Sequence, residues 1–200
     1  MQSTTILREY NPSQSLTGRF LSRIMPELNK SISDWILDIL EIRPYQYILE
    51  IGYASGYTLQ EIARRLKVGF LAGIDESILN YERAYQRNKK LIIDQLLQLH
   101  IGPSHDLAYP HHYFNSILVN YHAQPKFDSR SSLIQLAELL KPGGRLVTSF
   151  QASCSMKDEE ILRISDRMQE DLDQAGLRNI VRTGRETMTG SFLAFSANKE

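Results

Sequence analysis

The sequence has few features that would tie it to an oxidising compartment, a membrane or nucleic acid. Its single cysteine, Cys154, cannot form a disulfide within the chain. Lysine plus arginine and aspartate plus glutamate number 23 each, so no excess positive charge favours nucleic acid or an anionic membrane surface. No apolar run approaches the roughly 18 to 20 residues of a membrane span, and residues 1–14 lack the apolar stretch of a signal peptide. We therefore expect a cytoplasmic protein without a nucleic-acid or membrane partner.

What is present predicts one α/β domain. The chain has 200 residues, of which 42% are hydrophobic and 23% charged, as in ordinary globular proteins. Short apolar runs alternate with amphipathic helical patterns from Tyr45 onward, except for a polar loop over 102–112. Two last runs are separated by only a few residues and should pair antiparallel. The pattern predicts a doubly wound, mostly parallel, seven-stranded Rossmann-like sheet with an antiparallel C-terminal hairpin strand. The expected strands are about 46–51, 68–75, 96–101, 114–121, 145–150, 178–185 and 191–197, and the helices between them about 57–67, 77–94, 129–140 and 161–175.

The N-terminal part differs from the alternating part of the chain. Residues 1–12 have the composition of a loose arm, and helical patterns follow over 16–28 and 31–42. We expect residues 1–44 to form this arm and two lid helices over the site, and residues 45–200 to form one compact unit. Side chains of the lid helices, such as Trp35, would either contact a substrate or pack on the sheet.

The stretch around Glu50 predicts a ligand site. An apolar strand that carries this acid leads into a turn of small residues, Gly52 to Gly56, and then into an amphipathic helix. The glycine at the third position of a dinucleotide fingerprint is missing, and an acid before the turn suits an ammonium group better than a pyrophosphate. Asp75, which ends the next strand, lies 19 residues beyond Gly56, close to the spacing of an acid that binds ribose hydroxyls. The sequence thus predicts a nucleoside with a cationic tail as the ligand, and the alternative is that both acids are solvated strand ends.

Four segments, in this order, resemble the class I S-adenosylmethionine-dependent methyltransferases. Residues 48–56 are similar to the first motif of that family, and residues 73–77 to the second. Residues 102–115 resemble the loop and strand around the adenine, and residues 139–146 the late helix-to-strand turn. The resemblance covers most of residues 45–200. It implies S-adenosylmethionine as cofactor and methyl transfer to a small-molecule acceptor by direct displacement.

The resemblance also implies roles for individual residues. Asn120 and Tyr121, at the end of the fourth strand, would lie beside the reactive sulfonium. Tyr121 and His122 are the catalytic candidates, and the loop histidines His105, His111 and His112 are further candidates for a base. Tyr53 and Tyr57 would stack on the cationic cofactor or serve as packing residues. No metal site is expected, because no carboxylate stands at a recognisable ligand spacing from the histidines. The implied cofactor-binding residues are Glu50, Gly52, Tyr53, Ala54, Gly56, Asp75, Glu76, Ser104, His105 and Asn120.

Three departures from the family pattern define the alternative function. Ala54 replaces the middle glycine of the turn, which is tolerated if its φ is negative. Pro103 cannot accept a hydrogen bond from the adenine amino group through its side chain, so Ser104, His105 or Asp106 would have to do so. Asn115 replaces a common aspartate. The alternative is therefore a non-catalytic scaffold of the same fold that binds a nucleoside or S-adenosylmethionine. The sequence makes no prediction of the acceptor's identity or of the oligomeric state.

Overall fold

The computed structural model describes residues 30–103, 108–121, 129–187 and 190–200. A single seven-stranded sheet runs through it, in the order β3-β2-β1-β4-β5-β7-β6. Strands β1 to β5 are parallel, and β7 pairs antiparallel with both β5 and β6, so the predicted sheet and its C-terminal hairpin are confirmed. The strands are β1 (Tyr47–Ile51), β2 (Phe70–Asp75), β3 (Leu97–Ile101), β4 (Phe114–Tyr121), β5 (Leu140–Ser153), β6 (Leu177–Thr187) and β7 (Gly190–Lys199).

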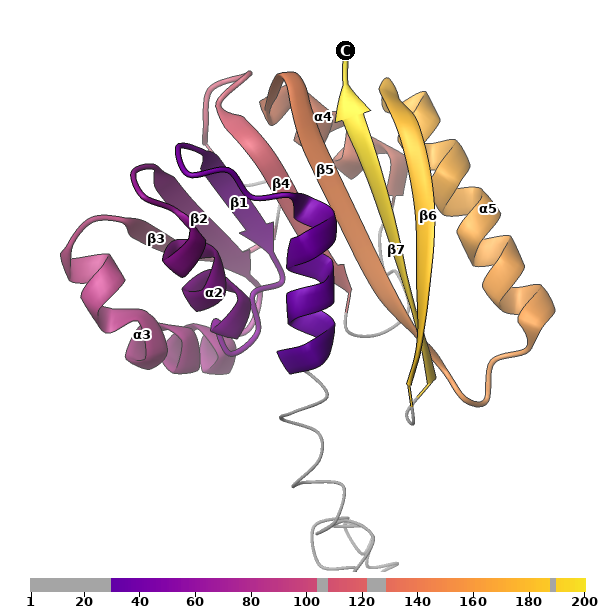
Figure 1. Ribbon diagram of the computed structural model, residues 1–200, viewed down its shortest axis with the longest axis horizontal. Helices are drawn as coiled ribbons and strands as arrows, with labels where there is room; N and C mark the ends of the chain where they lie inside the picture. The colour runs from indigo at the N-terminus through magenta and orange to yellow at the C-terminus, as the bar shows by residue number, and fades with distance from the viewer. Residues whose placement is uncertain (1–29, 104–107, 122–128, 188–189) are drawn as a thin grey trace, which may run out of the picture.

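Helices cover both faces of this sheet, as a doubly wound fold requires (Figure 1). A helix over residues 30–40 lies with α2 (Tyr57–Arg65) and α3 (Ile78–Ile93) on one face. On the other face lie α4 (Ser129–Leu139) and α5 (Asp158–Gln174). Ser77 caps the start of α3, since its side chain accepts a hydrogen bond from the Asn80 amide at 3.3 Å. Among the described helices, none is both long and apolar enough to cross a membrane.

Two hydrophobic cores lie on the two sides of the sheet, so the parallel strands are buried on both faces. On β1, Leu49 belongs to one core and its neighbour Ile48 to the other. The helix over residues 30–40 contributes four buried side chains to the second core, at Ile32, Ile36, Leu37 and Leu40. These positions make it a core helix along its length rather than the predicted lid. The other predicted lid helix, over 16–28, lies outside the described residues.

The fifth strand is longer than the sequence predicts. It includes the Lys-Pro-Gly-Gly segment that was expected to be a turn, and the register between β4 and β5 shifts there, between Phe114 and Ser116. Gly143 has a φ of 75°, and this left-handed conformation lets the chain keep pairing across the irregularity. Asn115 lies at the same place, where its Oδ1 accepts hydrogen bonds from the Tyr47 amide and from Lys141 Nζ. The start of β4 is therefore fastened to its neighbours by a side chain.

Candidate functional site

The turn from Gly52 to Gly56 lies where the parallel strands β1 and β2 end. In the sheet order, β1 stands between β2 and β4. The chain runs from β1 outward through β2 to β3 and then returns to β4 on the other side of β1, and this reversal of strand order is the usual place of a ligand crevice in an open α/β sheet. Three alternate residues of the turn have positive φ: Gly52 at 76°, Ala54 at 48° and Gly56 at 71°. The spacing of small residues in the sequence therefore reflects a backbone that is left-handed at every second position.

Ala54 is not in the conformation that we expected. Its φ is positive, and a left-handed residue with a Cβ costs about 1–2 kcal/mol relative to the ordinary conformation. Its amide donates a hydrogen bond of 3.0 Å to Asp75 Oδ2, which fastens the middle of the turn to the end of β2. Asp75 therefore helps to hold Ala54 in this strained conformation.

We expect Ala54→Gly to stabilise the protein by about 1 kcal/mol, because glycine adopts positive φ without the Cβ penalty. The free energy of unfolding from urea titration measures this effect. A matched control is Ala63→Gly inside α2, which should destabilise the protein by about 1 kcal/mol because glycine is a poor helix former. Loss of stability in both variants would contradict the strain assigned to Ala54.

Two side chains of α3 also hold the turn, through hydrogen bonds to its backbone carbonyls. Arg87 Nε donates to the Ser55 carbonyl at 3.0 Å, and Asn88 Nδ2 donates to the Gly56 carbonyl at 2.9 Å. Asn88 is buried and departs from helical geometry, with φ −111° and ψ 17°. Neither residue was predicted from the sequence to contact the turn. The available signal was an asparagine four residues after Ala84, on the face of α3 that should be apolar.

Glu50 is fully buried at the end of β1, with no exposed surface. Its Oε1 accepts a hydrogen bond of 2.7 Å from Asn120 Nδ2, and the Ser149 hydroxyl donates to Asn120 Oδ1 at 3.2 Å. Oε2 has no hydrogen-bond partner among the described residues, although the Thr58 hydroxyl lies near enough to favour the ionised carboxylate. Burial raises the pKa of Glu50 to about 8, despite the opposing effect of the Asn120 bond. The site thus holds a carboxyl group whose ionised form would be stabilised by a cationic ligand.

Asp75 is half-buried rather than a solvated strand end. Besides the Ala54 amide, its carboxylate accepts the Ser77 amide at 2.9 Å on Oδ1. The Asn80 side-chain amide lies 3.0 Å from Oδ1 and 3.2 Å from Oδ2. The next residue, Glu76, is exposed. Asp75 therefore organises both the glycine turn and the start of α3.

The two tyrosines of the turn differ in their surroundings. The Tyr53 side chain is only 2% exposed and packs in the core, where its hydroxyl donates to the His100 carbonyl at 3.0 Å. For Tyr53 the packing alternative therefore holds, and only its backbone remains to contact a ligand. The Tyr57 ring is half-buried, and the Arg87 guanidinium lies 5.8 Å from its centroid. A cation of the chain itself already contacts this ring.

The two described histidine candidates, His111 and His112, do not lie at the turn. Ser104, His105 and His122 lie outside the described residues, and of Tyr121 the structure gives the backbone, which pairs with Phe150. His111 and His112 precede β4, whose eight residues span about 26 Å, so they lie at the opposite edge of the sheet.

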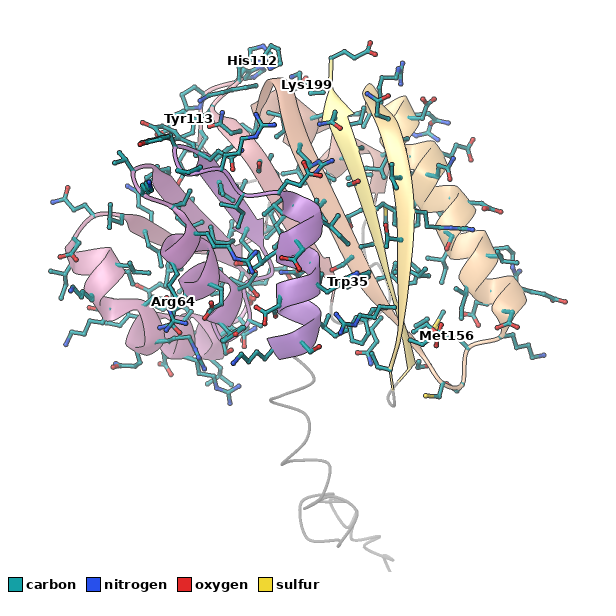
Figure 2. The ribbon with its side chains drawn as sticks, in the orientation of Figure 1. Trp35, Arg64, His112, Tyr113, Met156 and Lys199 are labelled. Atoms are coloured by element: carbon teal, nitrogen blue, oxygen red, sulfur yellow. The ribbon has the colours of Figure 1, made fainter. Side chains whose placement is uncertain are left out.

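Figure 2 shows His112 beside Lys199 at that edge, and their Nδ1 and Nζ atoms are 3.4 Å apart. Neither His111 nor His112 is a base in the crevice. Asn115 starts β4 at the same edge, so its departure from the family pattern does not touch the crevice. In the described part of the chain, no cluster of three or more histidine, cysteine or acidic residues could hold a metal ion.

The chain is similar to known methyltransferases in sequence and in fold. A family model described as a methyltransferase domain matches residues 48–144. The uncharacterized methyltransferase YdaC of Bacillus subtilis is 26% identical over 158 residues, which cover 78% of this chain and 85% of that protein. Among solved structures, a geranyl diphosphate methyltransferase in complex with S-adenosylmethionine matches with a TM-score of 0.70, 14% identity and 94% of each chain covered. The [4+2]-cyclase SpnF matches with a TM-score of 0.69 at 13% identity, over 84% of this chain and 80% of that one.

Proposed function

Because the chain belongs to the class I S-adenosylmethionine-dependent methyltransferases, we propose that it transfers a methyl group from S-adenosylmethionine to a small-molecule acceptor. The finding that carries the proposal is the buried Glu50 carboxylate beside the turn. One of its oxygens is bound by Asn120, and the other has no hydrogen-bond partner in the described residues. A buried carboxylate in this state needs a cation to remain ionised, and the ammonium group of the cofactor is such a cation.

The start of α2 suits the carboxylate of the cofactor's amino-acid part, whose ammonium group would bind Glu50. Gly56 precedes this helix, no described side chain caps it, and its first turn carries no acidic residue. Free backbone N–H groups at a helix start favour an anion, so the cofactor's carboxylate would bind there while its ammonium binds Glu50. The left-handed turn lets the ligand lie close to the backbone of Gly52, Tyr53 and Ala54.

The nucleoside would lie over the ends of β2 and β3. Asp75 would bind the ribose hydroxyls, since a carboxylate accepts hydrogen bonds from a vicinal diol. Glu76, exposed beside it, would border the adenine, with Ser104 and His105 on its other side. Asn120 would keep Glu50 in place rather than contact the reacting atoms, because its amide is engaged by Glu50 and Ser149.

When bound, S-adenosylmethionine supplies an electrophilic methyl group on a sulfonium. The residues of the chain then have to hold the acceptor in line with that group in a desolvated site. We assign this place to Tyr121 and His122, where β4 ends next to β1. A base is required only if the acceptor atom is protonated and weakly acidic.

Calorimetric titration with S-adenosylmethionine, S-adenosylhomocysteine and NAD tests the proposal. We expect binding of the first two and none of NAD, because the turn lacks the glycine at the third position of a dinucleotide fingerprint. Failure to bind either sulfur compound would sink the cofactor assignment. Tight binding without turnover on a panel of small acceptors would instead favour the scaffold alternative. SpnF shares the fold and is described as a cyclase, so this fold by itself does not imply methyl transfer, and turnover has to be measured.

A further inference from the structure

Asp75 accepts hydrogen bonds from three N–H groups of the chain itself. Two come from backbone amides, of Ala54 to Oδ2 and of Ser77 to Oδ1, at 3.0 and 2.9 Å. The third comes from the Asn80 side-chain amide, whose Nδ2 lies 3.0 Å from Oδ1 and 3.2 Å from Oδ2, so that one N–H is shared between the two oxygens. A carboxylate offers about four acceptor sites, so these donors occupy most of its capacity.

Asn80 occupies the sites that a ribose would need. A vicinal diol presents its O–H donors to the two carboxylate oxygens, and the side-chain amide of Asn80 bridges the same pair of oxygens with one shared N–H. The backbone amides of Ala54 and Ser77 are fixed by the turn and by the helix start, so they cannot move away from Asp75 when a ribose binds. The Asn80 side chain can move away from Asp75, because it is half-buried and stands in the first turn of α3, where its rotation carries the amide toward water.

We propose that Asn80 competes with the ribose of the cofactor for Asp75, and that it thereby lowers the affinity of the crevice for adenosine-containing ligands. This inference rests on the proposed function, since it requires Asp75 to bind the ribose. Asn80 is a specificity-determining residue in this sense: a ligand binds Asp75 only if its own donors replace the contacts of the Asn80 amide with the two carboxylate oxygens. Its own backbone amide stays bound to Ser77 Oγ, so the helix start remains capped when the side chain moves.

The Asn80→Ala variant should bind S-adenosylhomocysteine more tightly than the wild type, by roughly three- to tenfold, because the ligand no longer displaces hydrogen bonds to a charged group. Calorimetry measures this change. The gain should also appear with adenosine and be absent with 2′,3′-dideoxyadenosine, which has no diol. Ser77→Ala is the matched control: it removes the cap of the same helix without touching the Asp75 carboxylate through a side chain, and should leave the affinity within about twofold.

A second measurement uses the wild-type protein. The Asn80 side-chain amide signals in a nitrogen–proton correlation spectrum should shift on saturation with S-adenosylhomocysteine, as the amide leaves Asp75. Unchanged or weaker binding by Asn80→Ala, or Asn80 signals unmoved at saturation, would overturn the competition. Absence of binding by wild type and variant alike would overturn the proposed function together with it, so the two failures are distinguishable.

Discussion

The Glu50→Gln variant should be more stable than the wild type in alkaline solution. The fold raises the pKa of this carboxyl from 4.5 to about 8, so ionisation of Glu50 opposes folding. Its contribution to stability is fully present below pH 4.5, where the group is protonated in both states, and is lost as the pH rises to 8. Glutamine keeps the acceptor for Asn120 and removes the charge. The gain in unfolding free energy should grow from near zero at pH 4.5 to several kcal/mol, on the order of 4, above pH 8.

Urea unfolding of the cofactor-free protein at pH 4.5 and at pH 8.5 measures this difference. The exposed acid Glu82, on α3, provides the control, because Glu82→Gln should change stability little at either pH. We expect a pH-dependent gain in unfolding free energy for Glu50→Gln and none for Glu82→Gln. A Glu50→Gln variant that is less stable than the wild type at pH 8.5 would show that the buried carboxylate is compensated within the fold.

The same substitution should impair cofactor binding. Loss of the charged partner of the ammonium group should weaken S-adenosylmethionine binding by roughly 10- to 100-fold. The wild type should also release a proton on binding near pH 7, because the ligand's charge favours the ionised form of Glu50. Calorimetry in buffers of different ionisation enthalpy detects this proton, and Glu50→Gln should release none. Equal affinity in the two proteins would remove Glu50 from the ammonium site.

Local sequence was sufficient to predict the strand, the turn and the helix around Glu50. The apolar run, the small residues and the amphipathic period are all short-range signals. The hairpin of β6 and β7 was predictable for the same reason, since the short connection left antiparallel pairing as the simple solution. Helix starts such as that at Ser77 carry their own capping residue.

The contacts that set the chemistry of the site were not predictable, because they join distant positions. Asn120 reaches Glu50 from 70 residues away, and that contact helps to set the ionisation of the carboxyl. The positive φ of Ala54 depends on a hydrogen bond to Asp75, 21 residues away, rather than on the alanine itself. Tyr53 looked accessible as part of a loop, but its ring fills the space above Gly73, where a Cβ would lie 2.7 Å from Tyr53 Cδ1. Sequence order alone does not carry such distances.

Gly56→Ala should disrupt both the fold around the turn and the binding of the cofactor. The residue has a φ of +71°, which is strained for any residue with a Cβ. A Cβ here would also lie 2.9 Å from Ala84 Cα and 2.6 Å from Asn88 Nδ2, so the turn and α3 would have to separate. Backbone strain and overpacking together should cost about 2–5 kcal/mol of unfolding free energy. The Asn88 bond to the Gly56 carbonyl would be lost with the displacement.

Gly143→Ala separates the two causes, because Gly143 has nearly the same φ, +75°, while nothing lies within 4 Å of an added Cβ. This variant should show the conformational cost alone, about 1–2 kcal/mol, and should leave S-adenosylmethionine affinity unchanged. Urea unfolding and calorimetry on both variants give the comparison. If the two glycine substitutions cost the same and Gly56→Ala binds the cofactor normally, then close contact with α3 does not shape the turn. A larger loss at residue 56 in both measurements would instead show that the turn depends on α3 for its position as well as on left-handed glycine.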